Sequence, residues 1–274
     1  MAARNVILPD SGTFDLGDQQ LEYRFVGARP DRAPTLVLLH EGLGCVGLWG
    51  DFPDKLADAT GAGVFVYSRA GYGQSSPVTL PRPLTYMHHE AQQVLPRVLY
   101  AVGFQRGLLV GHSDGASIAA IYAGCVDDRR VRGITLIAPH FFTEDMGLAE
   151  IAKARIAYDD PATALRDRLA RWHKHVDNAF RGWNAAWLDP GFRKWDLTTF
   201  LKTIRVPVQV IQGVDDQYGT AEQVRTAQRL VPGIVDAVML DSVKHSPHRE
   251  APDRTVQAIT PFAARVLARN ETAA

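Results

Sequence analysis

Few cysteines and no excess of either charge characterise the sequence. Cys45 and Cys125 are its only cysteines and form no C-x-x-C pair, which excludes a disulfide framework. We interpret both as small buried hydrophobic residues. The 30 basic side chains balance the 30 acidic ones, so no positive charge is left over to neutralise a phosphate backbone. We therefore expect no nucleic-acid partner.

Long apolar runs are missing as well. No stretch approaches the roughly 18 consecutive apolar residues that a transmembrane helix needs. Near the start, the apolar run of Val6, Ile7 and Leu8 ends at Pro9, which makes it far shorter than the apolar core of a secretory signal. We expect a cytoplasmic protein that does not bind membranes.

An alternation of strand and helix patterns runs along most of the 274 residues, of which 46% are hydrophobic and 22% charged, as in ordinary folded proteins. Apolar runs predict strands at residues 21–27, 35–39, 64–67, 108–110, 134–138, 208–211 and 235–240. Helices are predicted at residues 49–60, 85–102 (where Pro96 can kink the helix), 116–123, 221–230 and 252–268. This order predicts an α/β fold with a mostly parallel sheet covered by helices on both faces.

The alternation stops between residues 140 and 203, where the sequence is helical, rich in arginine and aromatic. No Gly/Ser-rich linker borders this segment. We therefore predict one domain, with residues 1–139 and 204–274 forming the core and residues 140–203 forming a helical lid.

A short motif marks a candidate nucleophile. Residues 111–115 fit G-x-S-x-G between a predicted strand and a helix of small residues. In that setting Ser113 stands on a tight turn that needs small neighbours, above a helix N-terminus that favours developing negative charge. The motif predicts that Ser113 is a nucleophile.

A serine nucleophile needs a base that is itself held by an acid, and both types follow later in the chain. Asp215 and Asp216 come just after a predicted strand, and His245 comes just after the last one. Ligand sites of open α/β sheets lie at these carboxyl ends of the strands. The chain order is therefore serine, acid, histidine. We interpret Arg249 and Glu250 as solvated loop charges.

Four stretches resemble the α/β-hydrolase superfamily: residues 39–42 (LHEG), residues 68–75 (SRAGYGQS), the turn around Ser113 and the loop around His245. The resemblance implies that Ser113 is the nucleophile, His245 the general base and Asp216 the orienting acid, with Asp215 as the second choice. It also implies an oxyanion hole made by the backbone N–H groups of Gly42 and Asp114.

Two positions depart from the family pattern, because Glu41 stands where the family has glycine and Asp114 is acidic. Two carboxylates near a developing oxyanion would oppose it. We expect them to hydrogen-bond locally or to an arginine and to disfavour anionic substrates. Candidate pocket residues are Glu41, His140, Phe141, Trp183 and Trp187.

We therefore predict a serine hydrolase, without cofactor or metal, that cleaves a carboxylic ester or related acyl bond of a small, largely apolar molecule. Alternatives on the same fold are a thioesterase, lactonase, C–C hydrolase, perhydrolase, cofactor-free oxygenase or non-catalytic receptor. Residues 42–47 also fit G-x-G-x-x-G, which leaves an NADP-binding oxidoreductase as a distant alternative. The oligomeric state stays open.

Overall fold

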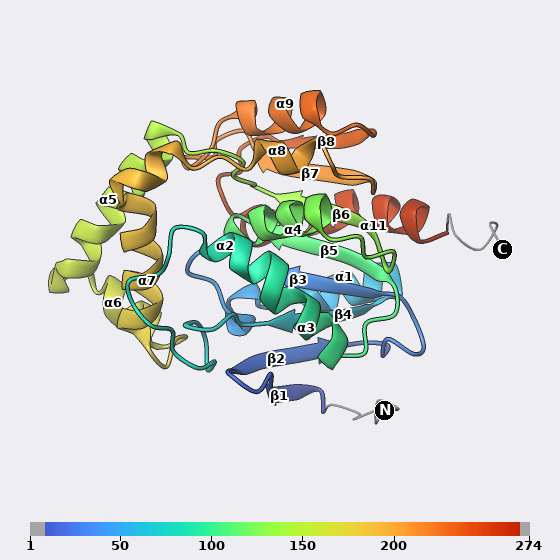
Figure 1. Cartoon of the computed structure of the whole chain (residues 1–274), viewed down its shortest axis with the longest axis horizontal. Helices are drawn as coiled ribbons and strands as arrows, with labels where there is room; N and C mark the ends of the chain where they lie inside the picture. Colours follow the sequence, from blue (N-terminus) through green and yellow to red (C-terminus); the bar gives the residue numbers. More distant parts are fainter. Residues whose placement is uncertain (1–8, 269–274) are drawn as a thin grey trace.

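A single eight-stranded sheet forms the centre of the molecule in the computed structural model, which describes residues 9–268 (Figure 1). The strand order is β1-β2-β4-β3-β5-β6-β7-β8, with β1, β2 and β4 antiparallel and all later pairs parallel. The strands are β1 (Ser11–Asp15), β2 (Gln20–Val26), β3 (Thr35–Leu39), β4 (Gly63–Tyr67), β5 (Gly107–His112), β6 (Val131–Ile137), β7 (Val208–Gly213) and β8 (Val235–Leu240). The predicted α/β class with a mostly parallel sheet is confirmed.

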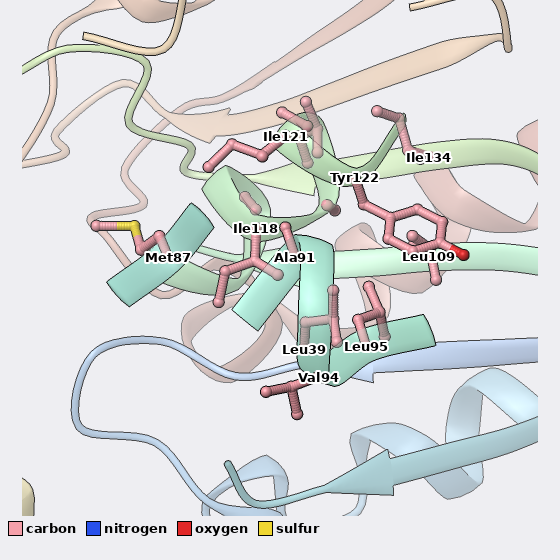
Figure 2. Packing of buried hydrophobic residues seen from close by; sticks show 14 of the residues in the cluster. Leu39, Met87, Ala91, Val94, Leu95, Leu109, Ile118, Ile121, Tyr122 and Ile134 are labelled. Carbon is pink, nitrogen blue, oxygen red and sulfur yellow. The ribbon is translucent and has the colours of Figure 1, made fainter. Parts of the chain in front are cut away.

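Helices cover both faces of the sheet, because successive side chains of a strand point to opposite faces. On β3, Leu36 and Leu38 belong to the apolar cluster under α1 (Phe52–Thr60) and α11 (Pro252–Ala268). Their neighbours on β3 face the cluster under α3 (Leu95–Ala101) and α4 (Asp114–Cys125), which Figure 2 shows. The five β3 side chains are all buried, which explains why the strand reads as a continuous apolar run.

Several local features differ from the predictions, among them the helix expected over residues 49–60, which begins at Phe52. The helix expected over residues 85–102 consists of α2 (Tyr86–His89), a π-helical turn (Glu90–Val94) and α3. Pro96 lacks the N–H that would bond the carbonyl four residues earlier, so the regular ladder is interrupted at this point. Strand β1 was not predicted, and Cys125 is exposed rather than buried.

The segment between β6 and β7 forms a helical insertion, which we define as residues 140–203. Its elements are α5 (Asp145–Asp159), η3 (Pro161–Thr163), α6 (Leu165–Ala170), α7 (Val176–Leu188), η4 (Pro190–Lys194) and α8 (Thr198–Leu201). Figure 1 shows α5, α6 and α7 grouped at one end of the sheet. The remaining short elements are η1 (Val46–Trp49), α9 (Ala221–Leu230) and α10 (Pro247–Glu250). Among residues 9–268, the helices are too short or too polar to cross a bilayer.

Candidate active site

Ser113 stands on the sharp turn between β5 and α4. Its backbone has φ 53° and ψ −117°, a conformation that residues other than glycine rarely adopt. Glycines make the turn possible, because a Cβ on Gly115 would lie 2.0 Å from the carbonyl oxygen of Leu39. A Cβ on Gly111 would lie 2.3 Å from the carbonyl oxygen of Gly115. The motif is therefore a steric requirement of this turn, and it fixes Ser113 at the N-terminus of α4.

His245 and Asp216 meet at the same end of the sheet, although they lie on different loops. Asp216 follows β7 and His245 follows β8, and these two strands are parallel neighbours. The Nδ1 atom of His245 lies 2.9 Å from Oδ1 and 3.0 Å from Oδ2 of Asp216. Since a carboxylate only accepts, Nδ1 carries the hydrogen and Nε2 is free to take a proton.

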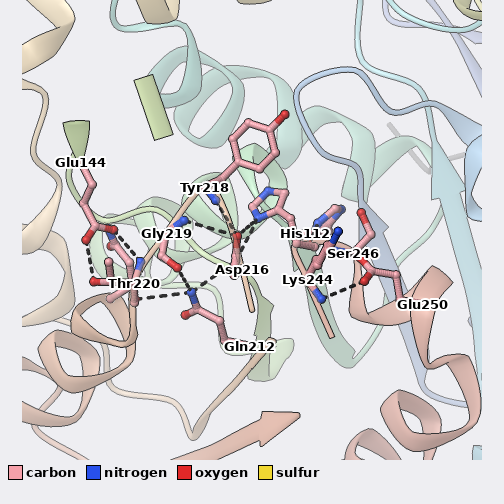
Figure 3. Close-up of polar contacts among 12 residues, drawn as sticks. His112, Glu144, Gln212, Asp216, Tyr218, Gly219, Thr220, Lys244, Ser246 and Glu250 are labelled. Atoms are coloured by element: carbon pink, nitrogen blue, oxygen red, sulfur yellow. Dashed lines mark hydrogen bonds and ion pairs between the residues drawn. The ribbon is translucent and has the colours of Figure 1, made fainter. Parts of the chain in front are cut away.

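The Asp216 carboxylate is held by further donors (Figure 3). The backbone N–H groups of Tyr218 and Gly219 donate to Oδ1 over 2.8 and 3.3 Å, and the Gln212 side chain donates to Oδ2 over 3.3 Å. Burial alone would raise the pKa of Asp216, but the hydrogen bond and charge of His245 outweigh it and hold the pKa below its usual value. Asp215 is exposed and is not among the partners of His245.

Three aromatic rings surround the His245 ring. The ring centroids of Tyr218, His112 and His140 lie 4.7, 5.1 and 5.4 Å from that of His245. Burial, together with the nearby His245, lowers the pKa of His140 to about 3. His140 is therefore a neutral imidazole at physiological pH, and it forms part of an uncharged aromatic wall beside the base.

Glu250 fixes the backbone on both sides of His245. Its carboxylate accepts hydrogen bonds from the backbone N–H of Lys244 over 2.8 Å and of Ser246 over 2.9 Å, as Figure 3 shows. The prediction of a purely solvated loop charge was wrong for this residue, although its surface is exposed. The signal that could have identified it is its place in the first turn of the short helix after His245, where a carboxylate can reach free backbone donors.

His112 connects three parts of the site. Its Nε2 donates to the main-chain oxygen of His245 over 2.8 Å, and its Nδ1 lies 3.3 Å from Oε2 of Glu41. Burial would raise the pKa of Glu41, but the hydrogen bond and charge of His112, with His248 and His40 nearby, hold it well below its usual value. Glu41 is therefore ionised and locally paired, as expected from the sequence. Nothing in the sequence pattern had singled out His112.

A buried arginine, Arg69, fixes the loop that follows β3. The Arg69 guanidinium donates to the main-chain oxygens of His40 and Glu41, and its backbone N–H donates to Nε2 of His40 over 3.0 Å. Since Nε2 accepts, His40 carries its hydrogen on Nδ1, which donates to the Glu41 oxygen over 2.7 Å. These contacts explain why the arginine of the SRAGYGQS segment is fully buried: it fixes the loop that carries Gly42.

The backbone N–H groups of Gly42 and Asp114 take part in none of the hydrogen bonds among residues 9–268. Each of them is therefore available to an oxygen of a bound molecule. The carboxylate of Asp114 is turned away and fully buried, where it accepts from the Tyr86 hydroxyl and, over 3.3 Å, from Nε1 of Trp187. Burial raises the pKa of Asp114, although Arg69 and these hydrogen bonds oppose the rise.

The other pocket candidates divide into two groups. Trp183 lies directly on Gly42, and Trp187 lies 5.2 Å from His140 between ring centroids. Phe141, in contrast, is completely buried in the core, where its main chain bonds to Gln223 and Leu197. A hollow of about 580 Å³ lies away from Ser113, at the end of α4, the beginning of β6 and the segment before β7.

The described residues hold no cluster of three or more histidine, cysteine, aspartate or glutamate side chains suited to a metal ion. His248 lies 4.6 Å from both His112 and Trp49 between ring centroids, and burial holds its pKa well below its usual value. It therefore packs in the core as a neutral ring next to His112.

Comparison with known proteins agrees with this architecture. The model of the alpha/beta hydrolase family matches residues 36–258, so the chain belongs to that family, as its motifs predict. An enol-lactonase from Burkholderia xenovorans LB400 superposes with a TM-score of 0.74 at 20% identity, covering 92% of this chain and 100% of the other. An esterase from Rhodococcus sp. ECU1013 superposes with a TM-score of 0.71 at 20% identity, covering 94% and 100%. These two likenesses concern the fold.

A sequence relative matches more closely but over less of its length. A proline iminopeptidase from Lactobacillus delbrueckii subsp. lactis is 31% identical over 120 residues, which is 44% of this chain and 40% of the relative. The chain thus matches less than half of that curated relative.

Proposed function

We propose that this protein is a serine hydrolase that cleaves a carboxylic ester or related acyl bond. The observation that carries the proposal is the pair of hydrogen bonds from Nδ1 of His245 to the Asp216 carboxylate, at the sheet end where Ser113 occupies its strained turn. The pair leaves Nε2 of His245 as a base, and the turn presents a hydroxyl at a helix N-terminus.

The first half of the reaction acylates the enzyme. Oγ of Ser113 forms a bond to the substrate carbonyl carbon while its proton passes to Nε2 of His245. The carbonyl oxygen becomes an oxyanion, which accepts from the N–H groups of Gly42 and Asp114. The carbon–oxygen bond to the alcohol then breaks, and the leaving oxygen takes the proton from His245.

The second half releases the acid. Water gives a proton to His245 and attacks the acyl carbon, and a second oxyanion forms in the same place. The bond to Ser113 then breaks, and its oxygen recovers the proton. Asp216 stays ionised throughout and stabilises the imidazolium, which agrees with a pKa held below its usual value by His245.

The residues beside His245 favour the proposal that the substrate is small and largely apolar. His140 is neutral at physiological pH, and Trp187 packs against it. Aromatic walls with few polar groups are typical of sites that bind apolar parts of a ligand. The helical insertion, which supplies Trp183 and Trp187, acts as the lid in this proposal.

Intact-protein mass spectrometry after treatment with a fluorophosphonate tests the nucleophile, and short p-nitrophenyl esters test turnover. We expect one adduct on the native protein, none on Ser113→Ala, and multiple turnovers on the esters. Asp216→Asn should lower kcat by about 10³- to 10⁴-fold, whereas Asp215→Asn, on the exposed neighbouring carboxylate, should change it less than about twofold.

Each other result contradicts part of the proposal. An adduct without turnover would favour a receptor, and no adduct would overturn the nucleophile assignment. Loss of activity in Asp215→Asn rather than Asp216→Asn would reverse the choice of acid.

A second substrate class comes from the partial match to a proline iminopeptidase. It predicts cleavage after an N-terminal proline, for which proline p-nitroanilide is the probe. Turnover of this amide at a higher kcat/KM than the esters would favour the peptidase over the esterase.

A further inference from the structure

Two tryptophans of α7 contact the two residues whose N–H groups form the proposed oxyanion hole. Trp183 and Trp187 are four residues apart on the helix and therefore share one face. Trp183 lies on Gly42, and Trp187 donates from Nε1 to the Asp114 carboxylate. The insertion thus contacts both residues beside which negative charge would develop in the proposed reaction.

The edge of the Trp183 indole that carries the N–H is the edge that faces Gly42. A Cβ on Gly42 would lie 2.1 Å from Nε1 and 2.3 Å from Cδ1 of Trp183. The backbone nitrogen of Gly42 is one bond of about 1.46 Å from the same Cα. The indole nitrogen of Trp183 and the backbone nitrogen of Gly42 are therefore close neighbours.

The two indole N–H groups differ in their partners. Nε1 of Trp187 donates to Asp114 and, over 3.1 Å, to the Tyr86 hydroxyl. Nε1 of Trp183 takes part in none of the hydrogen bonds among residues 9–268, and it is not one of the fully enclosed side-chain atoms without a partner, so its N–H stays accessible although the residue is only 7% exposed. An indole nitrogen is a donor only, and this accessible N–H can bond an acceptor that enters the site. A bound substrate would supply that acceptor.

We propose that the Trp183 indole N–H is a third donor of the oxyanion hole, supplied by the helical insertion. This inference rests on the proposed hydrolase function. A donor beside the oxyanion binds it more strongly than the neutral carbonyl of the substrate, so it lowers the barrier of the chemical step. Catalysis then requires α7 to be seated on the sheet, and Trp183 acts as a catalytic residue.

The pair Trp183→Phe and Trp172→Phe tests the proposal in kinetics. Phenylalanine keeps a ring over Gly42 but removes the N–H. We expect Trp183→Phe to lower kcat by about 10- to 100-fold with KM changed less than about threefold, since a hydrogen bond to a charged group is lost. Trp172, which is 43% exposed in the same insertion, is the matched control and should retain kcat within about twofold.

Nuclear magnetic resonance of the native protein provides a readout that does not depend on a variant's folding. Addition of an alkylboronic acid to ¹⁵N-labelled protein forms a tetrahedral anion on Ser113 that mimics the oxyanion. We expect the Trp183 indole N–H signal, identified by its loss in Trp183→Phe, to move downfield, and the Trp172 signal to stay in place.

The outcomes separate the two proposals. An adduct on Ser113 with an unmoved Trp183 signal, or with kcat unchanged in Trp183→Phe, overturns the third donor and leaves the hydrolase intact. A rise in KM alone would also overturn it, because it would show ground-state packing. If neither the boronic acid nor a fluorophosphonate reacts with Ser113, the hydrolase function and the third donor both fail.

Discussion

The ring of His112 donates from Nε2 to the main-chain oxygen of His245 across 2.8 Å. On its other side Nδ1 faces the Glu41 carboxylate at 3.3 Å. The ring therefore lies between two acceptors that belong to different loops. His112 precedes the candidate nucleophile, Glu41 precedes the candidate oxyanion donor Gly42, and His245 is the candidate base. The His112 side chain therefore fixes the positions of the Ser113 turn, the Gly42 loop and the His245 loop relative to one another.

Replacing His112 tests this connection. In His112→Phe the Glu41 carboxylate and the His245 carbonyl both lose a buried donor, so we expect the free energy of unfolding to fall by roughly 1–3 kcal/mol for each. We also expect kcat to fall by at least about tenfold with little change in KM. Urea titration and steady-state kinetics measure the two effects. The exposed His89, changed to asparagine, is the control. Native kcat in His112→Phe would contradict the positioning role.

Glu250→Gln should weaken the positioning of His245. An amide offers one acceptor oxygen where the carboxylate offers two, so one of the backbone bonds to Lys244 and Ser246 is lost. We expect a several-fold decrease in kcat and a loss of about 0.5–1.5 kcal/mol of stability. Arg249→Gln, at the exposed neighbouring position, should do neither. Equal effects of the two changes would argue for a general effect of the loop's charge.

Gly42→Ala should reduce activity through Trp183. The added methyl group would lie 2.1 Å from Nε1 of that tryptophan, so the indole or the loop must shift. We expect at least about a tenfold loss of kcat. The loss should be less than additive when Gly42→Ala is combined with Trp183→Phe, because the smaller ring relieves the clash. Full additivity in a double-mutant cycle would show that the two residues are not coupled.

Stability should fall in acid because of buried neutral histidines. The pKa of His140 is about 3 in the folded protein, against an ordinary value of 6.5. The unfolded chain therefore takes up a proton that the folded chain refuses, and stability decreases as the pH falls from about 6.5 towards 3. Each such group contributes a slope of up to about 1.4 kcal/mol per pH unit.

Denaturation midpoints and m-values at pH 7.5, 6 and 5, converted to free energies of unfolding, measure that slope. In His140→Phe the slope of the free energy of unfolding against pH should decrease by the contribution of about one proton, since phenylalanine does not titrate. His89→Asn, at an exposed position, should leave the slope unchanged. An unaltered slope in His140→Phe would mean that His140 takes up its proton as readily in the folded protein as in the unfolded chain.

The carboxylates of Glu41 and Asp114 should disfavour anionic acyl groups. Glu41 is ionised and partly exposed, with 19% of its side chain accessible, whereas Asp114 is fully buried. We therefore expect Glu41→Gln to raise kcat/KM for a succinyl ester relative to a butyryl ester several-fold, and Asp114→Asn to do so less. Competition between the two esters measures the ratio. If the ratio is unchanged in both variants, these carboxylates do not select against anionic substrates.

Local sequence patterns predicted most of the sheet and several helices with accuracy. Strand β3 and helices α9 and α11 begin and end at the predicted residues, because a short apolar run bounded by turn residues marks a buried strand and an amphipathic helix repeats its apolar residues every 3.6 positions. The break before Pro96 takes the form of a π turn, which a proline alone does not specify. Strand β1 shows a single buried residue, so it carries no apolar period to detect.

The sequence alone determined what depends on backbone sterics and on chain order. The glycines around Ser113 make the sharp turn, and the succession of strands brings Asp216 and His245 to one edge of the sheet. Only the tertiary structure decided which groups pair across that edge. Asp216 rather than Asp215 bonds His245, His112 joins Glu41 to the His245 loop, and α7 lies on Gly42 and Asp114. Such contacts join residues far apart in the chain, and no local period records where their side chains point.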